Sequence, residues 1–511
     1  MSSAVEQQIQ TPSSSSVSRI RSVSRDQYRA LVALITLVAA FLRFWQLGTR
    51  GFMIDEGFSW AIARSTWPDF FYGIATRTAD MTLHYFLLHL WSELGQSEFA
   101  LRSISALFGI ATIPVVAELG KRLYSRNAGL IAASLLTVHI FAIKFSQEIR
   151  AYPMVMFFAA LGWLQLTRIV RDPSHKNWFY FSLISLLAIY SHFIAGLNLI
   201  AQMATLFFLP VNRVNWRRVF ESLGVTFLGL IPALIYTFIH KGDLSWIKHT
   251  DKAILTEFFD SIAGRTFVPI QMYGVWALWG LVVVLFAAQW KRQRSGFEVW
   301  AASIPVTGTA LPFILLVTVA AYQPIFVPRY IAYVLLPFLL GIAWMLSRFK
   351  PAIALVSTAI LIAIFAWHLP AYYREPSWQD FRGAVAYVGM RHQPGDAIVV
   401  WEPMARPAVE YYGSRIPGFP EFLYPRSGNR FHAEDMMMVP DPFTLPPQFA
   451  QRRRIWIVFD LDKSPEEYNI VPPLFLERVI GRTHKMISFR QFQNVRVEEF
   501  EKTEEQSTTA N

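Results

Sequence analysis

Long apolar segments alternate with short polar connections along most of the chain. The eleven segments occupy residues 31–42, 99–119, 128–145, 152–170, 178–191, 193–210, 219–239, 272–289, 299–321, 330–347 and 352–369. A helix that spans the hydrocarbon core of a bilayer needs about 20 predominantly apolar residues, and most of these segments approach that length. The pattern therefore predicts a polytopic α-helical membrane protein with about eleven transmembrane helices.

After residue 370 the apolar runs become shorter and alternate with amphipathic stretches. The pattern predicts strands at 397–401, 454–459 and 489–497 and helices at 378–388 and 407–412. Alternating helices and strands are typical of an α/β fold. We therefore expect three parts: a disordered cytoplasmic tail at 1–27, a transmembrane domain at 28–370 and a small extracytoplasmic α/β domain at 371–511.

Composition supports a membrane protein and narrows the chemistry. Charged residues make up 16% of the chain and the mean hydropathy is +0.32, whereas charged residues make up about 25% of a soluble domain. Cysteine is absent, which excludes disulfides, a thiol nucleophile and a Cys-ligated metal. Nothing in the pattern indicates a nucleic-acid partner.

The basic residues predict the orientation in the membrane. Arginines precede the first apolar segment, and every second later connection is basic: 121–126, 168–176, 213–218, 291–294 and 348–350. Cytoplasmic loops carry the excess of Lys and Arg, so the N-terminus is expected inside and the C-terminus outside. This topology places Asp55, Glu148, His192 and Arg329 on one outer face of a plasma (inner) membrane.

The loop at 48–97 contains two amphipathic stretches, 58–72 and 83–94, which we expect to be helices lying in the outer interface. A third helix is expected near 254–262. It could lie in the interface or pack against the spans. The first apolar segment resembles a signal peptide, but Arg43 and two aromatic residues follow it instead of a small-residue cleavage site, so an uncleaved anchor is expected.

Two adjacent carboxylates, Asp55 and Glu56, follow the first segment. An ionised carboxylate is costly at the bilayer centre, so both must lie at the membrane surface or in a polar cavity. Glu148 forms a second acidic position between two later segments. We hypothesise that the two positions share one active site; the alternative is that each is a solvated loop charge.

Six short stretches carry a resemblance to a known superfamily. They are FMIDE at 52–56, TLHYF at 82–86, EFALR at 98–102, SQEIRAY at 146–152, YSHF at 190–193 and PRY at 328–330. In this order they resemble the type C (GT-C) glycosyltransferases, and more narrowly the prokaryotic members of the protein O-mannosyltransferase and aminoarabinose–lipid A transferase superfamily (glycosyltransferase family 39-like). The resemblance covers about 28–370. The prolines usual in the second motif are missing here, and neither a Trp-Trp-Asp motif nor an inserted lumenal domain is present.

The resemblance implies transfer of a sugar from a polyprenyl phosphate to a hydroxyl of a lipid, glycan or protein on the extracytoplasmic face, with inversion. By its place in the first motif, Asp55 is the expected general base. Glu56 is expected to orient it or to bind sugar hydroxyls, with a helix N-terminal acid as the alternative.

Several further residues are expected to bind substrate. Arg43, Arg150 and Arg329 are candidates for the phosphate, although arginines at span ends also extend to lipid headgroups. Glu148 is a candidate sugar or acceptor contact, or simply a partner of Arg150. His84 and His192 could bind hydroxyls or a divalent metal, or be packed interface histidines.

Tyr152 and Tyr330 belong to the matched motifs and are also expected to contact substrate. The pattern predicts no resident cofactor or metal ligand set. Two other classes remain open: a polytopic transporter, which would show an internal repeat and broken helices, and a membrane protein that binds lipid without transferring sugar.

Overall fold

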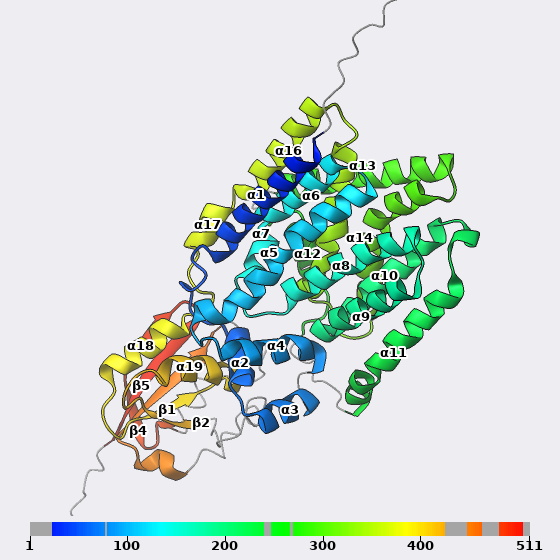
Figure 1. Ribbon diagram of the computed structural model, residues 1–511. Coiled ribbons are helices and arrows are strands. Elements are labelled where there is room, and N and C mark those ends of the chain that lie inside the picture. The colour runs from blue at the N-terminus through cyan, green and yellow to red at the C-terminus, as the bar shows by residue number, and fades with distance from the viewer. Residues whose placement is uncertain are drawn as a thin grey trace, which may run out of the picture.

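The computed structural model describes residues 23–76, 79–239, 247–265, 269–424, 447–461 and 480–503. Most of the expected tail at 1–27 lies outside these residues. Figure 1 shows a body of long helices, a smaller sheet-containing unit at one end, and three short helices between them.

All eleven apolar segments are helical. The helices of the body are α1 Arg25–Phe44, α5 Glu98–Leu123, α6 Arg126–Val138, α7 Ile140–Ser146, α8 Tyr152–Arg171, α9 His175–Ser191, α10 Gly196–Thr205, α11 Trp216–Ile239, α13 Pro269–Arg292, α14 Phe297–Ala320, α15 Leu335–Leu346, α16 Pro351–Ala366 and the short α17 Leu369–Arg374. The expected polytopic helical domain is therefore confirmed.

The expected number of about eleven spans is not confirmed. Within the described part of the chain, eight helices are long and apolar enough to cross a membrane, or nine if α6 and α7, which are bent by 60° at their junction, count as one span. Helix α9 has 17 residues, and the helical run Phe193–Phe208 is shorter. Segment hydrophobicity therefore predicted the helices correctly, and the number of about eleven spans stays a prediction.

One large apolar cluster holds the body together. Helix α15 is buried on all sides and lies at its centre, next to the 3-10 helix η5 Pro328–Val334. Helix α1 exposes most of its length, including Leu34, Leu37 and Phe41. The expected third loop helix is α12 Lys252–Ile262, and it packs on this cluster through Phe258 and Ile262.

The loop after α1 forms three short helices, α2 Ile54–Ala63, α3 Trp67–Thr76 and α4 Thr82–Ser92. The expected helix at 58–72 is thus two helices separated at 64–66. They lie between the helical body and the sheet unit (Figure 1).

The unit after the spans contains one five-stranded sheet in the order β2-β1-β3-β5-β4. Its strands are β1 Ala397–Val400, β2 Glu421–Tyr424, β3 Arg454–Asp460, β4 His484–Phe492 and β5 Val495–Lys502. Strands β1, β2 and β3 are parallel, and β3, β5 and β4 are antiparallel. Helices α18 Phe381–Arg391 and α19 Arg406–Gly413 complete the expected α/β unit.

The expected strand at 489–497 is wrong, because the chain reverses within it. Strands β4 and β5 form a hairpin whose turn contains Asn494 at φ 49°. Asparagine tolerates this left-handed conformation better than most residues. The apolar pattern on either side of the turn concealed it.

The α/β unit shares its core with the loop helices. Phe52, Trp60 and Leu88 belong to the same buried cluster as Val385, Val409 and Trp456. The closest approach is at Gly57, where an added Cβ would lie 2.6 Å from the backbone nitrogen of Ala408. Helix α2 therefore packs directly on α19.

The close contact between Gly57 and Ala408 leads to a testable prediction. Gly57→Ala should force α2 and α19 apart and cost about 1–3 kcal/mol of unfolding free energy, as overpacked cores do. The matched control is Gly73→Ala in neighbouring α3, where an added Cβ meets nothing within 4 Å and the substitution should be neutral or stabilising. Thermal unfolding of both variants in one detergent measures the difference, and equal melting temperatures would contradict the contact.

Candidate active site

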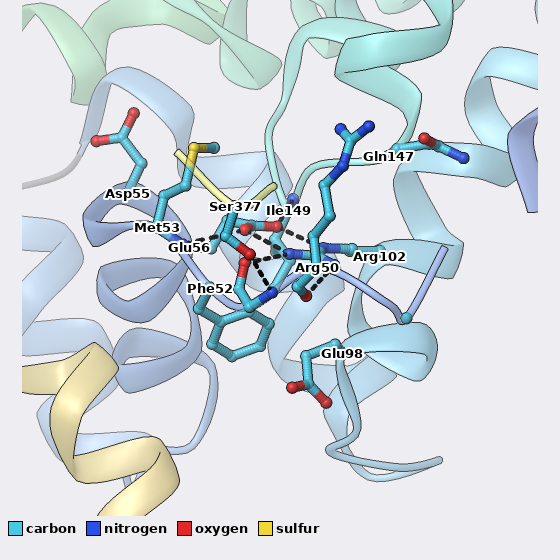
Figure 2. A network of polar contacts seen from close by, with 12 residues as sticks. Arg50, Phe52, Met53, Asp55, Glu56, Glu98, Arg102, Gln147, Ile149 and Ser377 are labelled. Atoms are coloured by element: carbon cyan, nitrogen blue, oxygen red, sulfur yellow. Dashed lines mark hydrogen bonds and ion pairs between the residues drawn. The ribbon is translucent and has the colours of Figure 1, made fainter. Parts of the chain in front are cut away.

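The two adjacent carboxylates point in different directions from the start of α2. Figure 2 shows Glu56 inside a polar network and Asp55 turned away from it. Successive residues of an α-helix are about 100° apart around the axis, so neighbouring side chains in the first turn face different surroundings. Each carboxylate therefore has its own set of partners.

Glu56 is fully buried and forms an ion pair with Arg102 of α5. Arg102 Nε lies 2.7 Å from Glu56 Oε1, and Arg102 Nη2 lies 2.7 Å from Oε2. The exposed fractions of the two side chains are 0% and 3%. The remaining Arg102 donors bind the carbonyls of Leu47, Arg50 and Gly51, so all five guanidinium N–H groups are used.

The same carboxylate also holds a second loop. Glu56 Oε1 accepts a hydrogen bond from the backbone N–H of Ile149 at 3.1 Å, and Oε2 accepts one from Met53 at 3.3 Å. Ile149 is the neighbour of Arg150. One buried carboxylate therefore joins the loop that carries Asp55 to the loop that carries Arg150. Glu56 is therefore part of a buried structural network, and its expected roles in orienting Asp55 or in binding sugar hydroxyls stay predictions.

The α/β unit holds the Asp55 loop from the other side (Figure 2). Three backbone N–H groups of this loop donate to side chains of the unit: Gly51 N to Ser377 Oγ at 2.7 Å, Phe52 N to Tyr412 Oη at 2.8 Å and Ile54 N to Gln379 Oε1 at 2.9 Å. The unit after residue 370 therefore contributes to the geometry of the loop, although no described side chain from it contacts Asp55.

Asp55 lies between two arginines. Its Oδ2 is 3.7 Å from Nη2 of Arg150 and 3.7 Å from Nη2 of Arg329. Arg150 lies in the loop between α7 and α8, and Arg329 lies on η5. The Asp55 side chain is 43% exposed, Arg329 is 33% exposed and Arg150 is 9% exposed. The carboxylate is thus ion-paired yet open to an approaching ligand.

Tyr152 links the two arginines. Its hydroxyl accepts hydrogen bonds from Nε of Arg329 at 3.0 Å and from Nη2 of Arg150 at 3.4 Å. Tyr152 is buried at the start of α8, so its hydroxyl is held in place by packing. The hydroxyl therefore bridges the two cations on either side of Asp55, which would otherwise repel each other.

These charges control the protonation of Asp55. Burial of the region would raise the pKa of Asp55, but Arg150 and Arg329 outweigh it and hold the pKa below its usual range. Asp55 is therefore ionised at neutral pH.

Two histidines border the same cluster and are neutral. Burial and the neighbouring arginines lower the pKa of His192 to about 3; burial and Arg150 lower that of His84 to about 3. His192 Nδ1 accepts from the Ile194 N–H at 3.3 Å, and its Nε2 has no hydrogen-bond partner within the described residues. The His84 ring nitrogens also make no hydrogen bond of good geometry there, although the Ile149 backbone is close.

Other expected residues lie nearby. Tyr330 packs on His192 with ring centroids 4.6 Å apart. Glu148 is half-buried, and burial raises its pKa despite the charges of Lys144, Arg329 and Arg150. No ion pair joins Glu148 to Arg150 in the described ranges, because Arg150 pairs with Asp55 instead.

The sequence did not single out Asp80 or Tyr85. Asp80 lies on the short 3-10 helix η1 Ala79–Met81, and burial raises its pKa although Arg150 opposes the shift. Tyr85 is buried on α4, within electrostatic range of Asp80, Arg150 and Asp55. Tyr85 lies within the 82–86 motif and Asp80 lies two residues before it, so this motif is the signal that could have found them.

Arg43 makes its contacts outside the cluster around Asp55. It is buried at the end of α1, where its guanidinium donates to the carbonyls of Leu136 and Thr137 at 3.4 and 3.3 Å. The last carbonyls of a helix have no partner within it, and α6 ends at Val138. Arg43 therefore caps the end of α6 at the bend to α7, and its expected role in binding a phosphate is not supported by these contacts.

The described residues contain no group of three or more His, Asp or Glu side chains arranged to hold a metal ion.

Comparison with known proteins defines the fold. Residues 81–237 match the sequence model of the family described as dolichyl-phosphate-mannose-protein mannosyltransferase. No curated protein matches the chain.

Solved structures match nearly the whole chain. ArnT from Cupriavidus metallidurans in the apo state has a TM-score of 0.60 at 14% identity, covering 92% of this chain and 98% of ArnT. The same protein bound to undecaprenyl phosphate gives 0.59 at 12% identity, covering 93% and 98%. The oligosaccharyltransferase AglB from Archaeoglobus fulgidus, in complex with an inhibitory peptide and a dolichol-phosphate, gives 0.54 at 10% identity, covering 94% of this chain and 75% of AglB.

The chain therefore has the fold of the type C glycosyltransferases. The resemblance expected from the motifs is confirmed for the fold, and the family model supports it within 81–237.

The two adjacent carboxylates should respond differently to neutralisation. Glu56→Gln breaks a buried ion pair and should cost about 3–5 kcal/mol of stability. Asp55→Asn removes partly exposed pairs and should cost at most about 1 kcal/mol. Thermal unfolding of both variants in the same detergent measures the contrast. Equal losses of melting temperature would contradict the division between a structural and a ligand-facing carboxylate.

Proposed function

We propose that the protein is an integral-membrane glycosyltransferase that moves a sugar from a polyprenyl-phosphate donor to an acceptor hydroxyl, with Asp55 as the general base. The single observation that carries the proposal is the ionised, ligand-accessible carboxylate of Asp55 between Arg150 and Arg329, in a fold shared with glycosyltransferases. Relatives of this fold have been solved with undecaprenyl phosphate and with a dolichol-phosphate, which supports the donor class.

The arrangement suits an inverting displacement. Asp55 takes the proton of the acceptor hydroxyl while the acceptor oxygen forms a bond to the anomeric carbon. The bond from that carbon to the phosphate oxygen breaks, and its electron pair leaves with the polyprenyl phosphate. The carbon is attacked from the side opposite the phosphate, so its configuration inverts.

The arginines have a separate role. Guanidinium groups bind phosphate oxygens through paired hydrogen bonds, and cations placed where negative charge develops lower the barrier. Arg329 is the more exposed of the two and is assigned the main contact with the leaving phosphate. Arg150 is nearly buried and supports it through Tyr152.

Binding of the donor would also activate the base. In the free protein both arginines lower the pKa of Asp55. A phosphate beside them neutralises part of their charge and thereby raises the pKa of Asp55, since a nearby opposite charge is what lowers it. Asp55 becomes a stronger base when the donor is present.

The neutral histidines and Glu148 are suited to hydrogen bonding with a sugar. His192 offers an unpartnered Nε2, and Glu148 is half-buried beside Arg150. We assign both side chains to hydrogen bonds with hydroxyl groups of the sugar or of the acceptor. The alternating basic connections support an extracytoplasmic location of this site and of the α/β unit in the plasma membrane.

The direct test incubates purified protein with a panel of labelled polyprenyl-phosphate sugars and a mixed set of lipid, glycan and peptide acceptors. Transfer of label to one acceptor supports the proposal. Binding of the donor without transfer or hydrolysis across the panel would instead support a lipid-binding protein.

Asp55→Asn should retain donor binding and lose transfer by about a hundred- to ten-thousand-fold, because loss of a general base typically costs this much. Turnover and donor affinity are measured in one detergent. Near-normal turnover would exclude Asp55 as the base and direct attention to Asp80 or Glu148.

Arg329→Ala should weaken donor binding, because it removes a phosphate contact rather than the proton acceptor. The matched control is Arg348→Ala, since Arg348 lies beyond the far end of α15 and should leave donor affinity unchanged. Equal donor affinities in the two variants would contradict the assignment.

A further inference from the structure

A groove of about 960 Å³ lies between α1 and α5, far from Asp55. Its lining residues are Arg25, Tyr28, Arg29, Val32, Ala33, Thr36, Leu37, Pro114, Ala117, Glu118, Lys121 and Arg126. Figure 1 shows the first turns of α1 at the end of the helical body opposite α2, α3 and α4. The volume is at the upper end of the range of about 300–1,000 Å³ that is usual for ligand pockets.

The groove is basic at one end and apolar along its length. Arg25, Arg29, Lys121 and Arg126 line the end at the first turns of α1, whereas Val32, Leu37 and Pro114 line the remainder. Helices α1 and α5 run in opposite directions, so the start of one and the end of the other bring their charges together. The layout matches a molecule with an anionic head and an apolar tail.

The positive charges at the basic end of the groove outnumber the negative charges of the described residues around it. Among the described residues that line the groove, Glu118 is the one acid, and it is shared by Lys121 and by Arg122 at 2.7 and 2.6 Å. Arg29 lies 3.9 Å from Asp26, with both side chains largely exposed, a geometry that contributes little. The basic end therefore retains a net positive charge.

The length of the groove matches one leaflet of a bilayer. From Arg25 to Leu37 the helix rises about 18 Å at 1.5 Å per residue, and half of a hydrocarbon core of about 30 Å is about 15 Å. Ala33 and Leu37 are exposed, so the apolar part opens towards the surrounding lipid. A head at Arg25 would place the tail end near the middle of the bilayer.

We propose that this groove binds an anionic glycerophospholipid, with its phosphate among Arg25, Arg29 and Lys121 and one acyl chain along Val32, Leu37 and Pro114. Basic pockets between transmembrane helices on the cytoplasmic side bind such headgroups, and the basic connections place this end of α1 in the cytoplasmic leaflet. The site is separate from the proposed transferase site and does not depend on its activity.

Native mass spectrometry of the purified full chain tests the proposal. The probes are phosphatidylglycerol and phosphatidylcholine with identical acyl chains, and undecaprenyl phosphate. The wild type should retain phosphatidylglycerol to higher collision energy than phosphatidylcholine, whereas undecaprenyl phosphate should be retained through the separate site at Asp55 and should not respond to changes in the groove. Equal retention of phosphatidylcholine would overturn the role of charge, and a larger loss of undecaprenyl phosphate than of phosphatidylglycerol in the groove variant Arg25→Gln with Arg29→Gln would overturn the choice of a glycerophospholipid.

Variants assign the lipid to the groove. Arg25→Gln with Arg29→Gln should weaken phosphatidylglycerol binding about thirtyfold, since each of the two basic residues contributes on the order of 1 kcal/mol near the surface. The charge-matched control, Arg213→Gln with Arg217→Gln, changes a basic connection outside the groove and should bind as the wild type does. Equal weakening in both pairs would show a general charge effect and contradict the site.

A second variant tests the apolar part. Ala33→Phe places a ring in the groove without altering charge, so it should displace the acyl chain and reduce phosphatidylglycerol retention. Unchanged retention in a folded Ala33→Phe protein, judged by its melting temperature, would overturn the assignment of the acyl chain.

Discussion

The buried ion pair between Glu56 and Arg102 is the interaction on which the site depends. It closes the loop after α1 onto α5, and through the Ile149 N–H it fixes the next loop as well. Removing one partner of such a pair leaves an uncompensated buried charge. Since Asp55 precedes Glu56 and Arg150 follows Ile149, this one pair sets the separation of the proposed base from its arginine.

The α/β unit also helps to position the loop that carries Asp55. Its side chains bind three backbone N–H groups between Gly51 and Ile54, and its core continues into the loop helices. Arg382 adds contacts to the carbonyls of Gly48, Thr49 and Arg50. These hydrogen bonds connect the α/β unit directly to the loop that carries Asp55.

The sequence predicted the fold well where the signal was local. Hydrophobic runs located the long helices of the described residues, and the motifs brought together Asp55, Arg150, Tyr152 and Arg329 from three separate stretches. Contacts between residues distant in sequence could not be predicted in this way. Nothing near Arg43 shows that it caps α6, and nothing beside Glu56 identifies Arg102 as its partner, although both residues lie in the matched stretches. The bend at His139 between α6 and α7 also could not be predicted from the sequence, because the apolar segment continues through it.

The most direct test of the account is the pH dependence of kcat/KM in the wild type and in Arg329→Gln, measured with the donor sugar that supports transfer. The acid limb of this profile reports the pKa of the base in the free enzyme. Arg329 lowers the pKa of Asp55, so its loss raises that pKa, and activity should fall at a higher pH as the solution is acidified. An acid limb at the same pH in both proteins would contradict the claim that Asp55 is the base and that these arginines keep it ionised.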